Sequence, residues 1–226
     1  MGNNKTFNTV ALCALIVAVA GLTIGFAAFT TSLTIQSRAE VHPGELNLDV
    51  VFSTSQSSAV NSAETVAPTV GGTDSSEASA TDATLNATTI SGLSASFTKP
   101  GQTATYSFYV YNSSQYTAYL NEILYNNASG TDPASFRNCQ PGSGTSNYTD
   151  ACDNIKVTVT VGAESDATKV STYQQITSGI NHSLASSTGE PVTVVISYEG
   201  EAIPDGDLTV TFGDIKLNYT SLNPSA

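Results

Sequence analysis

The chain has no tryptophan, and its 226 residues include only two histidines, three cysteines and one methionine. Lysine and arginine together number 7, against 19 aspartates and glutamates, which gives a formal net charge of −12. A protein that binds nucleic acid needs clustered cations to displace counterions from phosphates, so this balance argues against a nucleic-acid partner. The shortage of histidine and cysteine leaves little material for a zinc site or a nucleophilic catalytic centre.

The two histidines do not form a recognisable catalytic motif. A zinc protease of the common type needs two histidines four residues apart on a helix, with a glutamate between them. His42 precedes Pro43, and His182 has no second histidine at that spacing. The chain also lacks the G-x-S-x-G elbow that carries a hydrolase serine. We therefore expect a protein that is not an enzyme and that uses no cofactor.

The first thirty residues combine a polar start with a long uncharged run. Val10–Phe29 contains no charged side chain, and as a helix it would extend about 30 Å, enough to cross a bilayer. Small residues at Gly25 and Ala27 suit the −3 and −1 positions of a signal-peptidase site, so we expect cleavage between Ala27 and Ala28. Because the run is longer than the apolar core of a usual signal peptide, a retained single-pass anchor is the alternative. Both interpretations place residues 28–226 outside the cytoplasm, with any membrane contact made through the N-terminal helix alone.

The cysteines fit an exported protein. Cys13 lies within the apolar run and follows Leu12, where a lipoprotein signal would have a small residue. Cys139 and Cys152 are the two thiols of the exported part, and an even pair outside the cytoplasm predicts a disulfide. The bond would close a turn-rich loop and stabilise the fold by about 3 kcal/mol.

The exported part alternates apolar and polar residues with a period of two, which predicts β-strands rather than long amphipathic helices. The clearest patterns cover residues 29–36, 46–52, 104–110, 155–161, 192–198, 208–212 and 215–219, and weaker ones cover 88–97 and 117–125. Pro100-Gly101 predicts a type II turn, Gly213 a bulge, and residues 171–177 a short helix. About eight or nine short strands predict an all-β fold, a jelly-roll-like antiparallel β-sandwich preceded by an N-terminal hydrophobic signal or anchor helix.

This pattern divides the chain into three parts. Residues 1–27 are the signal peptide or membrane anchor, residues 28–42 a strand and linker, and residues 43–226 the β-sandwich domain. Within that domain, residues 53–87 are rich in serine, threonine and alanine and have few large apolar side chains. Such a composition cannot offset the entropy of ordering, so we expect a surface insertion or flexible loop, to which the stretch ETVAPTV could add an edge strand.

The densest group of carboxylates is Glu199, Glu201, Asp205 and Asp207. Oxygen ligands crowded into one loop can hold Ca²⁺, but the spacing does not match an EF-hand loop. Acidic hairpin loops are also common as solvated surface features. We therefore keep these four residues as a weak calcium candidate and expect no other metal ligands.

Three features together resemble the family of TasA and camelysin, the secreted biofilm-fibre proteins whose signal peptides are processed by a SipW-type signal peptidase. The apolar run ends in a small-aromatic-Ala site followed by Ala28-Phe29. The stretch PGELNLDV (residues 43–50) is similar to that family's SGTLDLS segment, and residues 90–125 are similar in order and spacing to its NLKPGD-containing core. The serine- and threonine-rich insertion and the Cys139–Cys152 loop depart from the family's pattern.

The resemblance implies a jelly-roll subunit that forms a homopolymer by donor-strand exchange, in which the N-terminal strand of one copy completes a sheet of the next. Phe29, Leu33 and Ile35 form one apolar face of that strand, which a neighbouring sheet edge could cover. Pairing of the strand within its own domain is the alternative. We expect a secreted fibre subunit of an extracellular biofilm matrix or cell surface. A membrane-anchored adhesin that does not polymerise, and a pilin that keeps its N-terminal helix, are the alternative functions.

Overall fold

The computed structural model describes residues 48–59, 62–130, 135–146, 148–162 and 182–223, together with the backbone of 168–171. The chain divides into two units, Met1–Pro43 and Gly44–Ala226, and all of the described residues belong to the second. The predicted signal or anchor and the N-terminal strand therefore lie outside the described residues, as does most of the helix predicted at 171–177. None of the helices in the described ranges combines the length and the apolar character that a membrane crossing needs.

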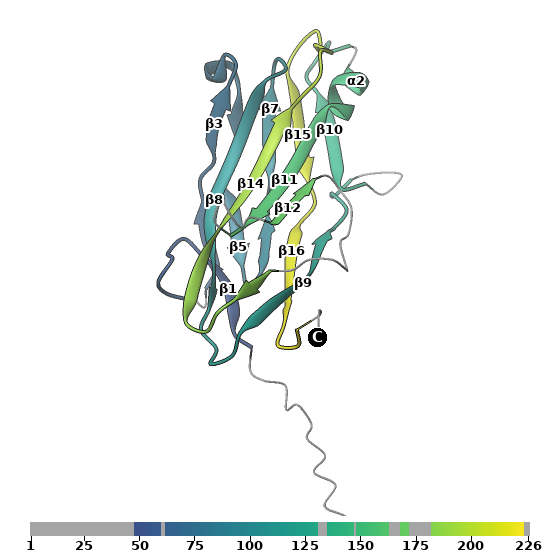
Figure 1. Cartoon of the computed structure of the whole chain (residues 1–226). Coiled ribbons are helices and arrows are strands. Elements are labelled where there is room, and N and C mark those ends of the chain that lie inside the picture. Colours follow the sequence, from purple (N-terminus) through teal and green to yellow (C-terminus); the bar gives the residue numbers. More distant parts are fainter. Residues whose placement is uncertain are drawn as a thin grey trace, which may run out of the picture. The chain divides into compact units, whose positions relative to one another are not determined.

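The described part of the chain consists mainly of β-strands, which confirms the all-β class (Figure 1). The strands are β1 (Val50–Ser53), β2 (Glu64–Val66), β3 (Thr69–Gly72), β4 (Ser79–Ala80), β5 (Ala83–Asn86), β6 (Thr89–Ser91), β7 (Ser94–Phe97), β8 (Gln102–Asn112), β9 (Ala118–Tyr125), β10 (Arg137–Pro141), β11 (Ile155–Val161), β12 (Thr168–Ser171), β13 (Ser183–Leu184), β14 (Thr188–Tyr198), β15 (Leu208–Phe212) and β16 (Ile215–Thr220). Within the same ranges, the 3-10 helix η1 (Ser75–Glu77) and the α-helix α2 (Tyr148–Asp153) interrupt them.

The strands pair into three antiparallel sheets. Sheet A has the order β1-β8-β14-β11-β12, with β3 also paired to β8; sheet C has the order β10-β15-β7-β4; and sheet B has the order β13-β9-β16-β6-β5-β2. The strand predicted at 88–97 is broken at Gly92-Leu93 into β6 of sheet B and β7 of sheet C. Likewise β15 of sheet C leads directly into β16 of sheet B. Sheets B and C therefore form one layer, which packs against sheet A as a sandwich (Figure 1).

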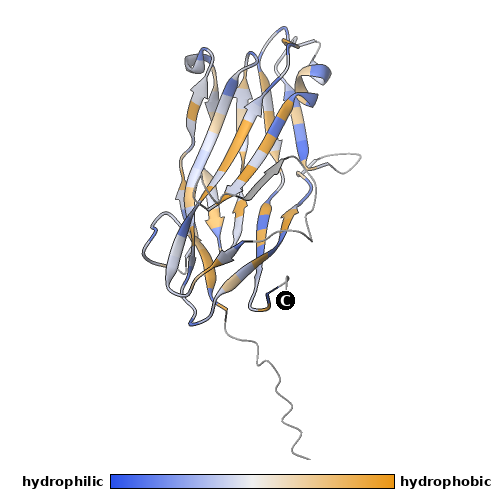
Figure 2. Cartoon of the chain, viewed as in Figure 1, coloured by the Kyte–Doolittle hydropathy of each residue, from blue (hydrophilic) through white to orange (hydrophobic). Residues whose placement is uncertain are grey.

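Alternating side chains of the long strands fill the space between the layers. Orange and pale bands alternate along β14 and β11 in Figure 2. The buried residues are Ala104, Tyr106, Phe108 and Val110 on β8, Ile155, Val157, Val159 and Val161 on β11, and Val192, Val194, Ile196 and Tyr198 on β14. Residues of all three sheets belong to one hydrophobic cluster. Contacts cross between the layers, since the rings of Phe97 on β7 and Tyr198 on β14 have centroids 6.1 Å apart.

Of the alternatives predicted for residues 53–87, a flexible loop does not fit the described part of that segment, whereas the predicted edge strand is present. The segment contains β2, β3, η1, β4 and β5. The stretch ETVAPTV adds two edge strands, because β2 ends sheet B and β3 pairs with β8 of sheet A. Val66, Ala83 and Leu85 are buried in the common core. A few apolar side chains are enough here because long-range pairing places them all on the inward face.

Two glycines show where the turn predictions were right and wrong. Gly101, between β7 and β8, has a φ of +88°, which the third position of a type II turn requires. Gly213 does not form the predicted bulge but lies at the break between β15 and β16. A Cβ atom there would lie 1.9 Å from the carbonyl oxygen of Asn126, so only glycine fits. The irregularity in the ladder comes later, between Asn218 and Tyr219 opposite β9.

Candidate functional site

The residues predicted for processing and for strand donation lie outside the described part of the chain. They are Ala27 and Ala28 at the cleavage site, and Phe29, Leu33 and Ile35 on the apolar face of the N-terminal strand. Their roles stay predictions. The other predicted site residues lie in the sandwich and can be placed.

The predicted disulfide is present and joins an edge strand to the short helix. Cys139 on β10 and Cys152 on α2 are bonded, with their Cα atoms 6.2 Å apart. Arg137 on β10 reinforces this link, because its Nη2 donates to Asp153 Oδ1 at 2.8 Å and its Nη1 donates to the carbonyl oxygen of Ile155 at 3.0 Å. Together these contacts tie the terminal strand of sheet C to α2 and to the start of β11 in sheet A.

The four carboxylates of the calcium candidate do not converge on one point. Glu199 Oε2 lies 2.6 Å from the Nζ atom of Lys156, and this hydrogen bond lowers the pKa of Glu199. Asp205 instead accepts a hydrogen bond from the hydroxyl of Ser146. Across the described ranges, no three His, Cys, Asp or Glu side chains lie close enough together to hold a metal ion. Residues that are near one another in this loop therefore face different partners.

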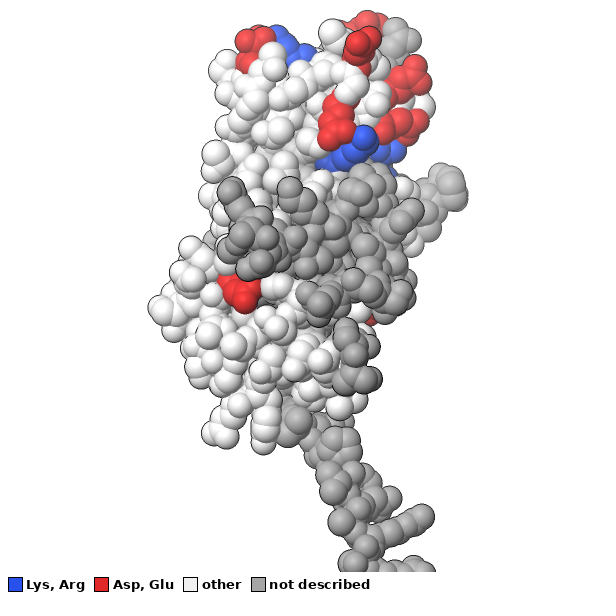
Figure 3. All heavy atoms as spheres, in the orientation of Figure 1, with Lys and Arg blue, Asp and Glu red and all other residues white. Residues whose placement is uncertain are grey.

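Charged side chains gather at the end of the sandwich that carries η1 and α2 (Figure 3). Carboxylates come from the loop around η1, from α2 and from the loop between β14 and β15. Lys99, Arg137 and Lys156 each pair with a carboxylate of this end. The cations of this end therefore take part in contacts that hold loops together.

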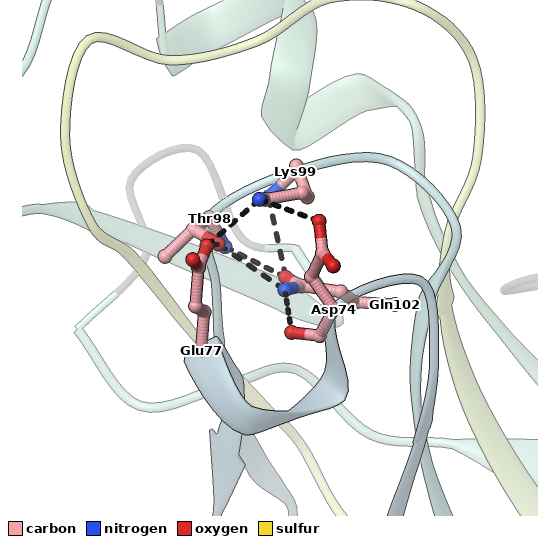
Figure 4. A network of polar contacts seen from close by, with 5 residues as sticks. All are labelled: Asp74, Glu77, Thr98, Lys99 and Gln102. Atoms are coloured by element: carbon pink, nitrogen blue, oxygen red, sulfur yellow. Dashed lines mark hydrogen bonds and ion pairs between the residues drawn. The ribbon is translucent and has the colours of Figure 1, made fainter.

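One of these contacts is a polar network between η1 and the turn before β8 (Figure 4). Gln102 is fully buried at its centre. Its Oε1 accepts hydrogen bonds from the backbone N–H groups of Thr98 (2.8 Å) and Lys99 (3.2 Å). Its Nε2 donates to the carbonyl oxygen of Asp74 (3.2 Å) and to Thr98 Oγ1 (3.1 Å). The amide therefore uses both of its donors and both acceptor positions.

An ammonium group closes the network on its outer side. Lys99 Nζ lies 2.8 Å from Asp74 Oδ2 and 2.9 Å from Glu77 Oε2. The hydrogen bonds to Asp74 and Glu77 raise the pKa of Lys99, which keeps it charged. Because these groups bond to one another, the network is best explained as an anchor of the serine- and threonine-rich segment.

A second polar group lies between the layers of the sandwich. His182, just before β13, is 8% exposed, and its Nε2 lies 3.0 Å from Glu190 Oε2 on β14. The two atoms are close enough for an ion pair, but their geometry does not meet that of a hydrogen bond. The buried Nε2 therefore has no hydrogen-bond partner among the described residues. The same holds for the buried hydroxyl of Tyr219 on β16. Burial and then the charge of Glu190 raise the pKa of Tyr219, which keeps its phenol neutral. We call His182, Glu190 and Tyr219 the end layer.

Strand register explains why these three residues meet. Tyr219 pairs with Leu120 on β9, and the N–H of Leu120 donates to the carbonyl oxygen of His182 at 3.0 Å. His182 and Tyr219 thus flank Leu120 in one row of sheet B. Glu190 belongs to sheet A and lies two residues before the inward-facing Val192 on β14, so it is on the same face of the strand. Sequence analysis considered His182 only for a catalytic site, either with zinc or with a hydrolase serine. The signal it missed was a carboxylate at an inward position of an otherwise apolar strand.

Comparison with models of known protein families and with curated protein sequences finds no match to this chain. A proposal for the function must therefore rest on the residue pattern of the N-terminal segment and on the contacts within the sandwich.

Proposed function

We propose that this protein is a secreted structural subunit, with a jelly-roll body, that assembles into extracellular fibres by β-strand addition. A SipW-type signal peptidase would cleave between Ala27 and Ala28. Phe29, Leu33 and Ile35 would then enter a neighbouring copy as a donated strand, and the polymer would serve as matrix material rather than as a catalyst.

The observation that carries the proposal is a one-sided apolar pattern at residues 29–36, in a part of the chain that belongs to a different unit from the sandwich. The chain divides into units at Pro43 and Gly44, so residues 29–36 belong to a different unit from the β-sandwich. A lone strand with one apolar face must cover that face, and the open edge of another sheet supplies both main-chain partners and an apolar surface.

The sandwich offers short terminal strands of the kind that strand addition needs. Among the described strands, β2 pairs only with β5, and β3 pairs only with β8. Each covers just three or four residues of its partner. A terminal strand has main-chain groups on its outer side that an added strand can bond.

The disulfide supports the export that the proposal requires. A bond such as Cys139–Cys152 forms and persists in oxidising compartments and is rare in the cytosol. It also holds β10 in place, so that the body can remain folded while its N-terminal segment exchanges.

Deleting residues 28–37 from the exported chain tests the proposal. We expect the unaltered protein to begin at Ala28, by intact mass, and to form filaments in negative-stain electron microscopy. We expect the deletion variant to stay monomeric by light scattering with an unchanged near-ultraviolet circular dichroism spectrum. Filaments formed by the deletion variant would contradict strand donation.

A species that keeps residues 1–27 in the membrane fraction would contradict secretion and favour an anchored surface protein.

A further inference from the structure

The part of the chain that follows the apolar run contains six Asn-x-Ser/Thr triplets, the acceptor sequence of N-linked glycosylation. They begin at Asn86, Asn112, Asn127, Asn147, Asn181 and Asn218. A chain rich in serine and threonine contains such triplets by chance, so their number alone indicates nothing. A glycan is bulky and must project into solvent, and the structure therefore separates the triplets that can carry one from those that cannot. Asn147 and Asn181 lie outside the described residues.

The chemistry of glycan transfer sets a requirement for the asparagine. A bond forms between its Nδ2 and C1 of the first sugar, while the bond from C1 to a lipid phosphate breaks. The lipid phosphate leaves as an anion, and Nδ2 gives up one proton to solvent, which balances the charge. The acceptor side chain must therefore reach solvent, and its Nδ2 protons must not already be donated to other groups.

Asn112, at the end of β8, fails this requirement. It is fully buried, and its Nδ2 donates at 2.8, 3.1 and 3.2 Å to the carbonyl oxygens of Tyr116, Leu184 and Ala185. Its Oδ1 accepts hydrogen bonds from the N–H of Ser114, at 3.1 Å, and from the Ser114 hydroxyl. A sugar on Nδ2 would break these bonds and would have to fit inside the core. Folded molecules therefore lack a glycan here, whether transfer comes before folding or after it.

Asn218 on β16 fails it as well. The residue is half-buried, and its Nδ2 donates to Glu122 Oε2 on β9. The hydroxyl of Thr220, the third residue of this triplet, accepts a hydrogen bond from the N–H of Leu222 at 3.2 Å. The polar groups of this triplet therefore stabilise the end of β16 and its pairing with β9.

Asn86 meets the requirement. It is exposed, at a position of β5 whose side chain points away from the core. The turn that follows is fixed through its backbone. The Phe52 N–H donates to the carbonyl oxygen of Ala87 at 2.6 Å, and the Leu217 N–H donates to that of Thr88 at 2.9 Å. Within the described ranges, no hydrogen bond engages the side-chain amide of Asn86, so a rigid turn presents this amide to solvent.

Asn127 meets it in the loop after β9. Asn127 and Ser129, the first and third residues of the triplet, are both exposed. The loop backbone is fixed here too, since the Asn126 N–H donates to the carbonyl oxygen of Asp214 at 2.9 Å. Asn138 Nδ2 donates to the carbonyl oxygen of Ser129 at 3.0 Å. Neither the Asn127 amide nor the Ser129 hydroxyl forms a hydrogen bond with another described residue.

We propose that this protein is N-glycosylated at Asn86 and Asn127 and not at Asn112 or Asn218. The substrate is an oligosaccharide carried on a lipid phosphate, and transfer takes place on the outer side of the membrane that the chain crosses. The disulfide between β10 and α2 fits that compartment. The inference rests on the export that the proposed function requires but not on strand addition, and an anchored protein would carry the same two glycans.

Peptide mass spectrometry of the protein isolated from its own cells tests the proposal. We expect the peptides that contain Asn86 and Asn127 to carry the added mass of whole sugar residues. Peptides of the two other described triplets should have the mass of their sequence. Thr88→Val removes the hydroxyl that the triplet needs and keeps Asn86, so the intact protein should lose one glycan. Thr89→Val is the matched control, because this neighbouring hydroxyl lies outside the triplet, and it should leave the mass of the glycan in place.

Ser129→Ala should remove the second glycan in the same way. If Thr88→Val fails to fold, Asn86→Gln removes the acceptor itself and should cause the same loss of mass. Unmodified peptides at both Asn86 and Asn127 would overturn the proposal, as would a glycan at Asn112 in the folded protein. Electron microscopy of the same preparation reports on the fibres separately. Filaments without glycans would overturn the glycosylation alone, and glycosylated monomers would confirm it while contradicting the fibre.

Discussion

At the scale of single residues, buried amides hold the loops of this protein to its strands. Gln102 joins the turn before β8 to the loop around η1 through four hydrogen bonds. Asn112 does the same between β8 and the segment after β13. A buried polar group that loses its partner costs more than an average hydrogen bond contributes, because the remaining group stays desolvated. These amides therefore matter more to the stability of the loops than the ion pairs on the surface.

We expect Gln102→Ala to lower the free energy of unfolding by about 2–4 kcal/mol, because it leaves the N–H groups of Thr98 and Lys99 without their acceptor. Urea denaturation at neutral pH measures the change. Gln140→Ala is the matched control, since Gln140 is exposed on β10 and, among the described residues, its side chain donates one hydrogen bond, to Asn138 Oδ1 at 2.8 Å. The control should change stability by less than about 0.5 kcal/mol. Equal, small losses in both variants would mean that the network is not an anchor.

At the scale of elements, the start of the serine- and threonine-rich segment is held by close contact with β14. Gln56 Nε2 donates to the carbonyl oxygen of Gly189 at 3.3 Å. A Cβ atom on Gly189 would lie 2.1 Å from the carbonyl oxygen of Gln56 and 3.2 Å from the ring of Tyr111. The segment can lie here only because β14 has a glycine at this position.

We expect Gly189→Ala to displace residues 54–59 from β14, because backbone atoms cannot make room for the added methyl group. Limited proteolysis measures the effect, and cleavage within residues 54–59 should become at least about tenfold faster. Gly71→Ala on β3 is the control. Its Cβ would meet only the hydroxyl of Thr103 at 3.3 Å, which can rotate away. Equal cleavage rates in both variants would contradict the contact.

The elements also show which parts of the fold follow from sequence pattern alone. Alternation predicted β8, β11, β14, β15 and β16 because each buries one continuous face. It did not predict that residues 53–87 would form regular structure, because β2 to β5 are only two to four residues long and depend on distant partners. The helix α2 was also missed, since it has six residues and only Ala151 is buried.

The polar sites followed the same rule. The disulfide could be predicted because Cys139 and Cys152 are the only two cysteines that follow the apolar run Val10–Phe29, so counting them was sufficient. The end layer could not, because His182, Glu190 and Tyr219 meet only through the pairing of β9 with β16 and the packing of sheet A on sheet B. The calcium candidate was the opposite case: its four carboxylates are close together in the sequence but do not lie around one point in the structure.

At the scale of the whole molecule, the sandwich is built from two layers around one core. The disulfide and Arg137 join those layers at the end that carries α2. Near the other end of β14, the end layer of His182, Glu190 and Tyr219 joins them. The N-terminal segment belongs to a separate unit. A subunit that exchanges strands needs this combination, since the body must stay folded while the segment is donated.

The most direct test of strand donation places charge on one face of the N-terminal strand at a time. In the chain that begins at Ala28, Leu33→Asp together with Ile35→Asp puts two carboxylates on the apolar face. Ser32→Asp together with Thr34→Asp puts the same two charges on the polar face. We expect electron microscopy to show filaments for the polar-face variant and monomers for the apolar-face variant, because the proposed assembly buries only the apolar face in the neighbouring copy. Filaments of equal number and length from both variants would contradict assembly by strand donation.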